Sequence, residues 1–297
     1  MLSGQRTAAT VRMNRMIRLL TNLLVAACFC LPVHATDFSK AERVLFPLWT
    51  DSPVDGANGS KWNADAMINN PGASGIAIYP IVSIYGRTSG DIGPRATCSL
   101  TFLPDTYLGI GNGTKDDIAG RILYVDRAGA DQLVYLNRLY DLTRSPAYAV
   151  DIPVVRERDL KSSRLTLANV PLDPRVRTRL RVYDPFQTAG GEVVVRFWAE
   201  WPVSNIGAAA SFQPPQLLGS ISLKLHTTVR PPDEGDLDVE PAYAELPITP
   251  DLLSNIPPYS TAHFSIDVEP VTPGLRFWAF VSVTDNESQH VLLITPH

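Results

Sequence analysis

Residues 177–183 read Arg177-Thr178-Arg179-Leu180-Arg181-Val182-Tyr183, a stretch in which charged and apolar side chains alternate. Successive side chains of an extended chain point to opposite faces, so this stretch predicts a β-strand with charge on one face and apolar groups on the other. Gly219–Thr227 repeats the alternation, with an apolar residue at every second position. Glu192–Trp201 is longer and richer in apolar residues, which is typical of a central strand. Together these three segments indicate a sheet protein, because strict alternation favours strands over helices.

Similar short segments, bounded by turn residues, fill the rest of the chain. Those before residue 157 are Val44–Trp49, Lys61–Ile68, Gly75–Tyr85, Thr97–Phe102, Tyr107–Ile110, Gly120–Asp126, Gln132–Leu136 and Ala147–Val155. Those after it are Arg164–Leu167, Arg177–Tyr183, Glu192–Trp201, Gly219–Thr227, Ala262–Val268, Leu275–Thr284 and His290–Thr295. About seven strands is the number expected of an immunoglobulin-like sandwich. We therefore predict an all-β fold of two tandem antiparallel β-sandwich (immunoglobulin-like) domains, residues 36–156 and 157–297, after a signal peptide.

Three finer features belong to this prediction. Pro153 interrupts Ala147–Val155, which predicts an edge strand or a bulge, because proline cannot donate to a sheet ladder. Helical signals are short and confined to Asp116–Leu123, Asp131–Tyr140 and Thr249–Asn255. In the last of these, Pro250 suits the first helical position behind a threonine cap.

The second half contains one internal echo. Arg196-Phe197-Trp198-Ala199 recurs as Arg276-Phe277-Trp278-Ala279, although the flanking residues differ. We interpret the two copies as core strands of one sandwich and expect their aromatic side chains to pack between its sheets.

The N-terminal segment has the order basic, apolar, small, which is the layout of a secretory signal peptide. Arg12, Arg15 and Arg18 precede the apolar run Leu19–Leu31, and Ala35 closes the segment. We expect cleavage after Ala35, giving a signal peptide of residues 1–35 and a secreted or periplasmic protein.

Alternatives remain for this segment. Val25-Ala26-Ala27-Cys28 resembles a bacterial lipobox, and cleavage before Cys28 would leave the chain lipid-anchored at the envelope. An uncleaved anchor is less favoured because the apolar run is shorter than the ~20 residues that span a bilayer. Translation could start at Met1, Met13 or Met16, since the stretch before the arginines is long for a basic region.

Composition excludes several classes of protein. Hydrophobic residues make up 45% and charged residues 19%, as in a folded protein. The net charge is −4, and removing the four arginines of the signal peptide takes it to about −8. A nucleic-acid partner is not expected, because such proteins carry a basic surplus. Cleavage after residue 35 leaves Cys98 as the one cysteine, so neither a disulfide framework nor a thiolate metal cluster is expected. Cys98 lies in an alternating run and predicts a buried strand thiol.

Four segments carry a resemblance to known proteins: Asp55–Trp62, Asn69–Gly72, Val154–Leu160 and Trp278–Asn286. They resemble segments of uncharacterised secreted bacterial β-sandwich (immunoglobulin-like) proteins. The resemblance covers much of the mature chain and implies an extracellular β-sandwich. It implies no activity and carries over no functional residue.

Tests for catalytic and metal-binding motifs give no catalytic residue, no metal ligand and no cofactor. Ser74 lacks the spacing of a nucleophile elbow. No two histidines lie one helical turn apart, as zinc proteolysis requires. The acidic runs Asp233–Glu240 and Asp116-Asp117 are interpreted as solvated loops rather than calcium sites or paired glycosidase carboxylates.

One local concentration of positive charge stands out in this acidic chain. Arg175, Arg177, Arg179 and Arg181 occupy alternate positions, so a strand places them on one face, named here the basic face. One interpretation is a solvated outer face paired with acids such as Asp159 and Asp173. The other is a binding face for an anionic partner such as a polysaccharide, a lipid headgroup or an acidic protein surface.

Two functions are consistent with these features. The first is an exported, non-enzymatic protein for adhesion, envelope scaffolding or partner binding, with an envelope protein or polysaccharide as partner. The alternative is an extracellular hydrolase or carbohydrate-processing enzyme that uses loop carboxylates. We favour the first, because no convergent catalytic set is visible.

Overall fold

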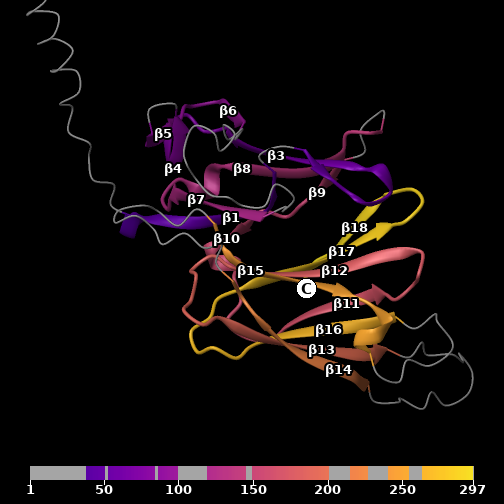
Figure 1. Ribbon diagram of the computed structural model, residues 1–297. Coiled ribbons are helices and arrows are strands. Elements are labelled where there is room, and N and C mark those ends of the chain that lie inside the picture. The colour runs from indigo at the N-terminus through magenta and orange to yellow at the C-terminus, as the bar shows by residue number, and fades with distance from the viewer. Residues whose placement is uncertain are drawn as a thin grey trace, which may run out of the picture. The chain divides into compact units, whose positions relative to one another are not determined.

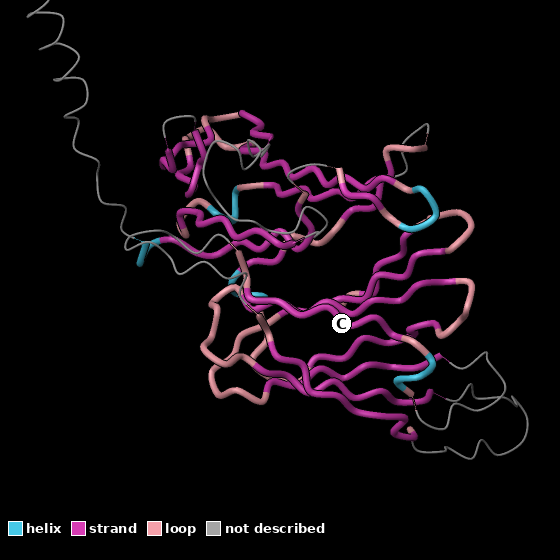
Figure 2. The backbone as a smooth tube through the Cα atoms, viewed as in Figure 1, coloured by secondary structure: helices cyan, strands magenta, loops and turns pink. Residues whose placement is uncertain are grey.

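Strands dominate the computed structural model, which is all-β (Figure 1). The structure describes residues 38–50, 53–83, 86–99, 119–144, 149–200, 215–226, 240–253 and 263–296, which lie in the second of two units, Phe38–His297. Helical turns in these ranges are short 3-10 segments (Figure 2): η1 Phe38–Lys40, η2 Ala57–Gly59, η4 Ala130–Gln132, η5 Glu157–Asp159 and η6 Pro250–Leu252. Over the same ranges, none of the helices has the length and apolarity needed to cross a membrane.

The strands before residue 157 form two sheets. Sheet 1 has the order β2-β3-β8-β9, with β6 also paired to β3, and sheet 2 has the order β10-β1-β7-β4-β5. The bounds in sheet 1 are β2 Val54–Asp55, β3 Lys61–Asn70, β6 Ala96–Ser99, β8 Val134–Asp141 and β9 Ala149–Asp151. The bounds in sheet 2 are β1 Ala41–Trp49, β4 Ile76–Ser83, β5 Gly86–Ile92, β7 Ala119–Asp126 and β10 Val155–Arg156. All pairings in both sheets are antiparallel.

The strands after residue 157 form two further antiparallel sheets. Sheet 3 has the order β15-β12-β17-β18 and sheet 4 the order β11-β16-β13-β14. The bounds in sheet 3 are β12 Val176–Asp184, β15 Ala242–Ile248, β17 Trp278–Asp285 and β18 Val291–Ile294. The bounds in sheet 4 are β11 Leu165–Pro171, β13 Glu192–Glu200, β14 Gln216–Lys224 and β16 His263–Pro270. β13 lies between two partners, so the predicted central strand is confirmed.

Three hydrophobic clusters show how the sheets face each other. The first contains Phe46 of sheet 2 and Ile68 of sheet 1, and the third contains Leu180 of sheet 3 and Phe197 of sheet 4. The second cluster, named here the junction, joins sheets 2 and 3. Its buried members are Ala41, Leu45, Leu48, Ile122, Tyr124, Leu139, Ile152, Val155, Leu160, Tyr183, Trp278 and Phe280. Sheets 2 and 3 are therefore covered on both faces, which explains why β1 and β17 are buried over most of their length.

Alternation along single strands produces this double burial. In β1, Phe46 packs toward sheet 1 while Leu45 packs into the junction. In β12, Leu180 packs toward sheet 4 while Tyr183 packs into the junction. The Tyr183 hydroxyl donates a buried 2.7 Å hydrogen bond to the backbone carbonyl of Pro47, 136 residues away in sequence.

Ion pairs and cation–π contacts at the end of β12 near Asp184 also join the two sequence halves. The Arg43 guanidinium lies 4.3 Å from the centre of the Phe186 ring, and the Arg276 guanidinium lies 4.9 Å from it. Glu157 pairs with both arginines and with Arg127. These contacts close the space between sheets 2 and 3 at that end.

Several local predictions need correction. The predicted strand Gly120–Asp126 is confirmed, and its residues pair with β1 and β4. The alternative prediction of a helix over Asp116–Leu123 is therefore wrong for the described part of that segment. Asp131–Tyr140 is also mainly a strand, β8. The turn at Pro250 is confirmed as one 3-10 turn, with Pro250 near its start. The predicted strand Tyr107–Ile110 lies outside the described residues.

The tryptophans of the internal echo do not pack as predicted. Phe197 and Phe277 do lie between sheets 3 and 4. Trp198, one position later, points to the outer face of sheet 4, where its indole N–H donates a 3.0 Å hydrogen bond to Asp267. Trp278 points the opposite way from Phe277, into the junction. The prediction was wrong because adjacent residues of a strand cannot share one face.

Candidate functional site

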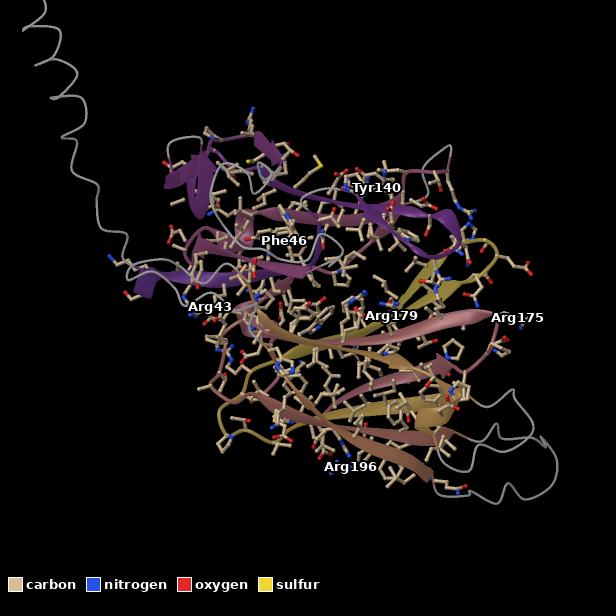
Figure 3. All side chains as sticks on the ribbon, viewed as in Figure 1. Arg43, Phe46, Tyr140, Arg175, Arg179 and Arg196 are labelled. Carbon is tan, nitrogen blue, oxygen red and sulfur yellow. The ribbon has the colours of Figure 1, made fainter. Side chains whose placement is uncertain are left out.

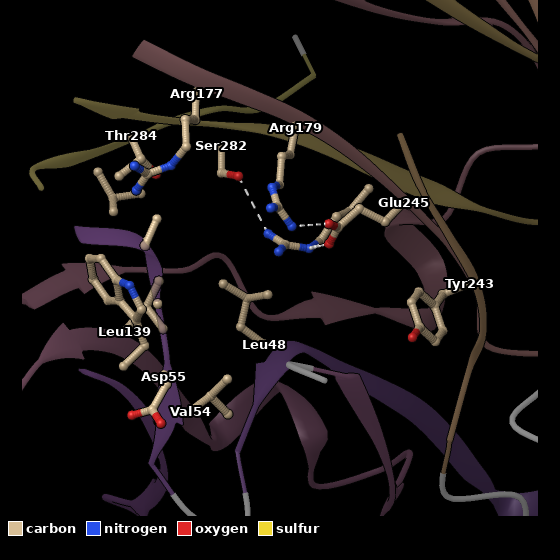
Figure 4. Close-up of a pocket in the computed structure, with 15 residues that line it drawn as sticks. Leu48, Val54, Asp55, Leu139, Arg177, Arg179, Tyr243, Glu245, Ser282 and Thr284 are labelled. Atoms are coloured by element: carbon tan, nitrogen blue, oxygen red, sulfur yellow. Dashed lines mark hydrogen bonds and ion pairs between the residues drawn. The ribbon is translucent and has the colours of Figure 1, made fainter. Parts of the chain in front are cut away.

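A cavity of about 380 Å³ lies between sheet 3 and strands of sheets 1 and 2 (Figure 4). Its lining residues are Leu48, Val54, Asp55, Gly56, Ala57, Trp62, Leu139, Arg177, Arg179, Arg181, Tyr243, Glu245, Ser282, Thr284 and Val291. We name it the junction cavity. Its volume is within the range of pockets that hold small ligands.

Strand alternation places three arginines in one wall of the junction cavity. Arg177, Arg179 and Arg181, named here the arginine row, project from the same face of β12. Sheet register then fixes their neighbours, because Cβ atoms of directly opposed residues lie ~5 Å apart. Arg177 lies opposite Thr284 and Arg179 opposite Ser282 on β17, while Arg181 lies opposite Glu245 on β15. The positive charge of this wall therefore follows from alternation along β12, and the register of sheet 3 fixes the residue opposite each arginine.

One carboxylate serves two members of the arginine row (Figure 4). The Arg181 Nε donates a 2.8 Å hydrogen bond to Oε2 of Glu245, and Arg179 pairs with Oε1 of the same carboxylate. The Arg181 side chain is only 10% exposed, and it also donates a 3.4 Å hydrogen bond to the Ser282 hydroxyl. Both oxygens of Glu245 are thus occupied by guanidinium groups, and these two arginines share one negative charge.

Arg177 is held differently. Its two terminal nitrogens donate to uncharged acceptors, the side-chain carbonyl oxygens of Asn286 at 3.0 Å and Gln289 at 2.8 Å. Among the described residues it forms no ion pair. Burial of its guanidinium, together with the positive charge of Arg179, lowers the pKa of Arg177 below its ordinary value. Arginine nevertheless stays protonated, so Arg177 presents an uncompensated and partly desolvated positive charge to the cavity.

The opposite wall is mainly apolar. Leu48 of β1, Val54 of β2 and Leu139 of β8 are buried side chains that face the arginine row across the cavity (Figure 4). Trp62 of β3 completes this wall. The cavity therefore has a cationic wall on sheet 3 and an apolar wall built from the first half of the chain.

The loop before Trp62 depends on glycine. A Cβ atom at Gly56 would lie 2.5 Å from the indole nitrogen of Trp62 and 2.3 Å from the hydroxyl oxygen of Ser60, so only glycine lets the loop approach the ring. Asn58 in the same loop has a φ of 58° and donates a 3.0 Å hydrogen bond to the backbone carbonyl of Asn286. Because the Asn286 side chain also accepts from Arg177, this bond joins the loop to a residue that positions the Arg177 guanidinium.

The structure divides the predicted basic face. Arg177, Arg179 and Arg181 line the cavity, whereas Arg175 lies at the outer end of β12 with an 81% exposed side chain paired to Asp173 (Figure 3). The predicted solvated pairing with Asp173 is therefore confirmed for Arg175. Of the other three, Arg181 is buried and Arg177 is half-buried, so a solvated outer face is wrong for these two. The Arg179 side chain is 47% exposed and paired with Glu245, as the solvated interpretation predicts.

No direct signal for the apolar wall is present in the sequence. Asp55–Trp62 carries only a resemblance, and nothing in its composition links it to an arginine strand more than a hundred residues away. Glu245 belongs to β15, a strand that the sequence analysis did not predict. The position of Tyr243 and Glu245 directly opposite β12 is a property of sheet pairing alone.

The remaining sequence candidates do not add a second site. Among the described residues, no three His, Cys, Asp or Glu side chains gather as a metal site would require. Asp116-Asp117 and all of the acidic run Asp233–Glu240 except its last residue lie outside the described residues. Glu240 itself forms a 2.6 Å ion pair with Arg121. Cys98 is half-buried rather than fully buried, and burial raises the pKa of its thiol.

Comparisons with known proteins assign no family: no protein-family model, no curated protein and no solved structure matches the chain.

Proposed function

We propose that this protein is an exported, non-enzymatic binding protein, built of two tandem immunoglobulin-like β-sandwiches, whose partner places an anionic group in the junction cavity. The observation that carries this proposal is the arginine row, which lines a cavity with Arg181 buried and Arg177 half-buried. Guanidinium groups against an apolar wall are weakly hydrated. Such a group attracts an anion more strongly than a fully hydrated cation in open water does.

Charge balance supports an anionic ligand. Three arginines and two acids, Asp55 and Glu245, line the cavity, so its lining carries a surplus of one positive charge. The chain as a whole has a net charge of −4. A local positive site in an acidic protein concentrates anions at that site rather than over the whole surface.

The occupation of Glu245 favours binding over hydrolysis. A glycosidase needs two carboxyl groups free to exchange protons or attack substrate across the scissile bond. Both oxygens of Glu245 accept from arginines, which leaves Asp55 as the one cavity carboxylate without such partners among the described residues.

A fluorescence titration tests the site. The probe is 1-anilinonaphthalene-8-sulfonate, which combines one negative charge with aromatic rings. We expect saturable binding to the native protein and at least a tenfold weaker affinity in the double variant Arg177→Gln/Arg179→Gln. The matched control is Arg175→Gln, an arginine that directly precedes β12 and lies outside the cavity, which should bind within twofold of the native protein. Equal binding by all three proteins would refute the site.

Mass spectrometry of the N-terminus tests export. In a bacterial host we expect a mature chain that begins at Thr36, or a lipidated chain that begins at Cys28. An intact chain in the cytosol would refute the exported part of the proposal and leave the binding part standing.

A further inference from the structure

We infer that the ligand of the junction cavity is a monocarboxylate with a compact apolar body, its carboxylate held by Arg177 and its body against Trp62, Leu48 and Leu139. This inference rests on the proposed function, because it specifies the anion that the same cavity binds.

Arg177 provides the carboxylate site. Its guanidinium has five N–H donors, of which Asn286 and Gln289 occupy one on each terminal nitrogen. The planar fork of the remaining donors matches the two oxygens of a carboxylate. Since both protein acceptors are uncharged amides, the positive charge of Arg177 is left for the ligand.

The net charge of the cavity lining favours a ligand with a single negative charge. Three arginines face Glu245 and Asp55, so one anionic charge neutralises the lining. A phosphate monoester carries nearly two charges, and the second would enter a partly buried cavity without a counter-charge. Unpaired charge in such a place is costly.

The apolar wall selects the body of the ligand. Leu48, Leu139 and Trp62 offer surface but no side-chain acceptor, and both oxygens of Glu245 are occupied. A sugar ring packed against these three side chains would bring hydroxyl donors that this wall cannot accept, and a buried donor without a partner costs affinity. The other acceptors of the lining belong to Asp55, Tyr243, Ser282 and Thr284, outside this wall. An aliphatic or aromatic body has no such donors. The volume of about 380 Å³ lies near the lower end for ligand pockets, which limits this body to a compact one.

Isothermal titration calorimetry with small probes tests this inference. The primary probe is 3-phenylpropanoate; 3-phenylpropanamide lacks its charge, acetate lacks its body, glucuronate has a polar body and phenyl phosphate has a second charge. We expect 3-phenylpropanoate to bind at least tenfold tighter than each of the other four. Tighter binding of glucuronate or phenyl phosphate would overturn the inferred class while leaving an anion-binding function in place.

Variants locate the binding. Arg177→Gln should weaken 3-phenylpropanoate binding at least tenfold, and Arg177→Lys should recover only part of that loss, because lysine keeps the charge without the fork. Trp62→Leu should also weaken it, whereas Arg175→Gln should not change it. Thermal melting of each variant checks that it is folded. Unchanged affinity in folded Arg177→Gln would overturn the assignment.

The source of the carboxylate is distinguished by a third comparison. Acetyl-Gly-Gly-Phe with a free C-terminus represents the end of a partner protein, and its C-terminal amide is the control. Tighter binding of the free peptide than of 3-phenylpropanoate indicates a protein C-terminus, and the reverse indicates a small organic acid; both outcomes support the class. If neither peptide nor acid binds while the sulfonate probe still requires Arg177, the carboxylate class fails and the proposed function survives. If replacement of Arg177 also leaves binding of the sulfonate probe unchanged, both the carboxylate class and the proposed function fail.

Discussion

Replacing Tyr183 by phenylalanine tests the contact between the two halves of the chain. Tyr183 belongs to β12 in the second half, is fully buried, and donates a 2.7 Å hydrogen bond to the carbonyl of Pro47 in the first half. Its ring stacks on Phe280 with centroids 6.2 Å apart and planes 4° apart. Phenylalanine keeps this stacking and the apolar burial, so the substitution removes one hydroxyl and one hydrogen bond.

The expected loss is about 1–2 kcal/mol of unfolding free energy. Removing the donor leaves the Pro47 carbonyl buried without this partner, and such a loss costs roughly 1–3 kcal/mol. We place the value in the lower part of that range because a carbonyl with one unfilled lone pair is tolerated better than an orphaned N–H group. With a urea slope of about 3 kcal/mol per molar, the midpoint should fall by about 0.3–0.7 M.

The assay is urea unfolding at neutral pH, followed by tryptophan fluorescence. The control is Tyr140→Phe, since the Tyr140 hydroxyl accepts from Asn63 and donates to Asp65 at a half-buried position that water can reach. We expect the control to lose less than about 0.5 kcal/mol. Equal, small losses in both variants would show that the Tyr183 hydroxyl is hydrated, and the reasoning about the junction would be refuted.

Three further predictions concern the cavity and the sheets around it. Glu245→Gln leaves the Arg181 side chain, 10% exposed, without its carboxylate; we expect a loss of about 2–3 kcal/mol in urea unfolding, below the value for a fully buried pair because the Glu245 side chain is 25% exposed. A loss under about 0.5 kcal/mol would contradict this pairing. Gly56→Ala places a Cβ atom 2.5 Å from the Trp62 indole nitrogen, so the ring must move; we expect weaker binding of 1-anilinonaphthalene-8-sulfonate, and native affinity would count against the apolar wall. Burial opposes ionisation of Asp141, but hydrogen bonds from Lys61 at the start of β3 and from Thr143 in the turn after β8 outweigh it and lower the pKa of Asp141. The contribution of Asp141 to stability is therefore present above about pH 4 and lost as the pH falls through the lowered pKa. Asp141→Asn should therefore flatten the acid side of a plot of urea midpoint against pH, and parallel curves for the two proteins would disprove it.

The two halves of the chain contribute different kinds of side chain to the junction cavity. All the arginines of the cavity come from β12, and the apolar wall comes mainly from β1, β2, β3 and β8. Ligand pockets are frequent where two packed units meet, because neither unit alone encloses the space. A ligand that needs both walls would therefore report on the packing that Tyr183 tests.

Residue patterns alone predict the all-β class and the positions of most of the strands. Alternation in residues 177–183 identified β12, and the proline at 153 separated β9 from β10, which lie at the edges of two different sheets. Three strands, β2, β5 and β15, are not predicted by the sequence, and β2 has only two residues. β5 contains glycine, serine and aspartate, and β15 contains two alanines and Pro247, so neither has the composition of a strand. Pairing with β4 and β12 holds them in the sheets.

What covers each face of a strand is visible only in the folded protein. Alternation shows that Arg177, Arg179 and Arg181 share a face, but it contains no information about a wall contributed by residues more than a hundred positions away. The same limit explains the tryptophans: the repeated Arg-Phe-Trp-Ala sequence is identical in both copies, yet Trp278 is buried in the junction and Trp198 is half-exposed. Local sequence fixes the two directions in which side chains point, whereas packing between distant sheets determines whether a direction leads to water, to a core or to a cavity.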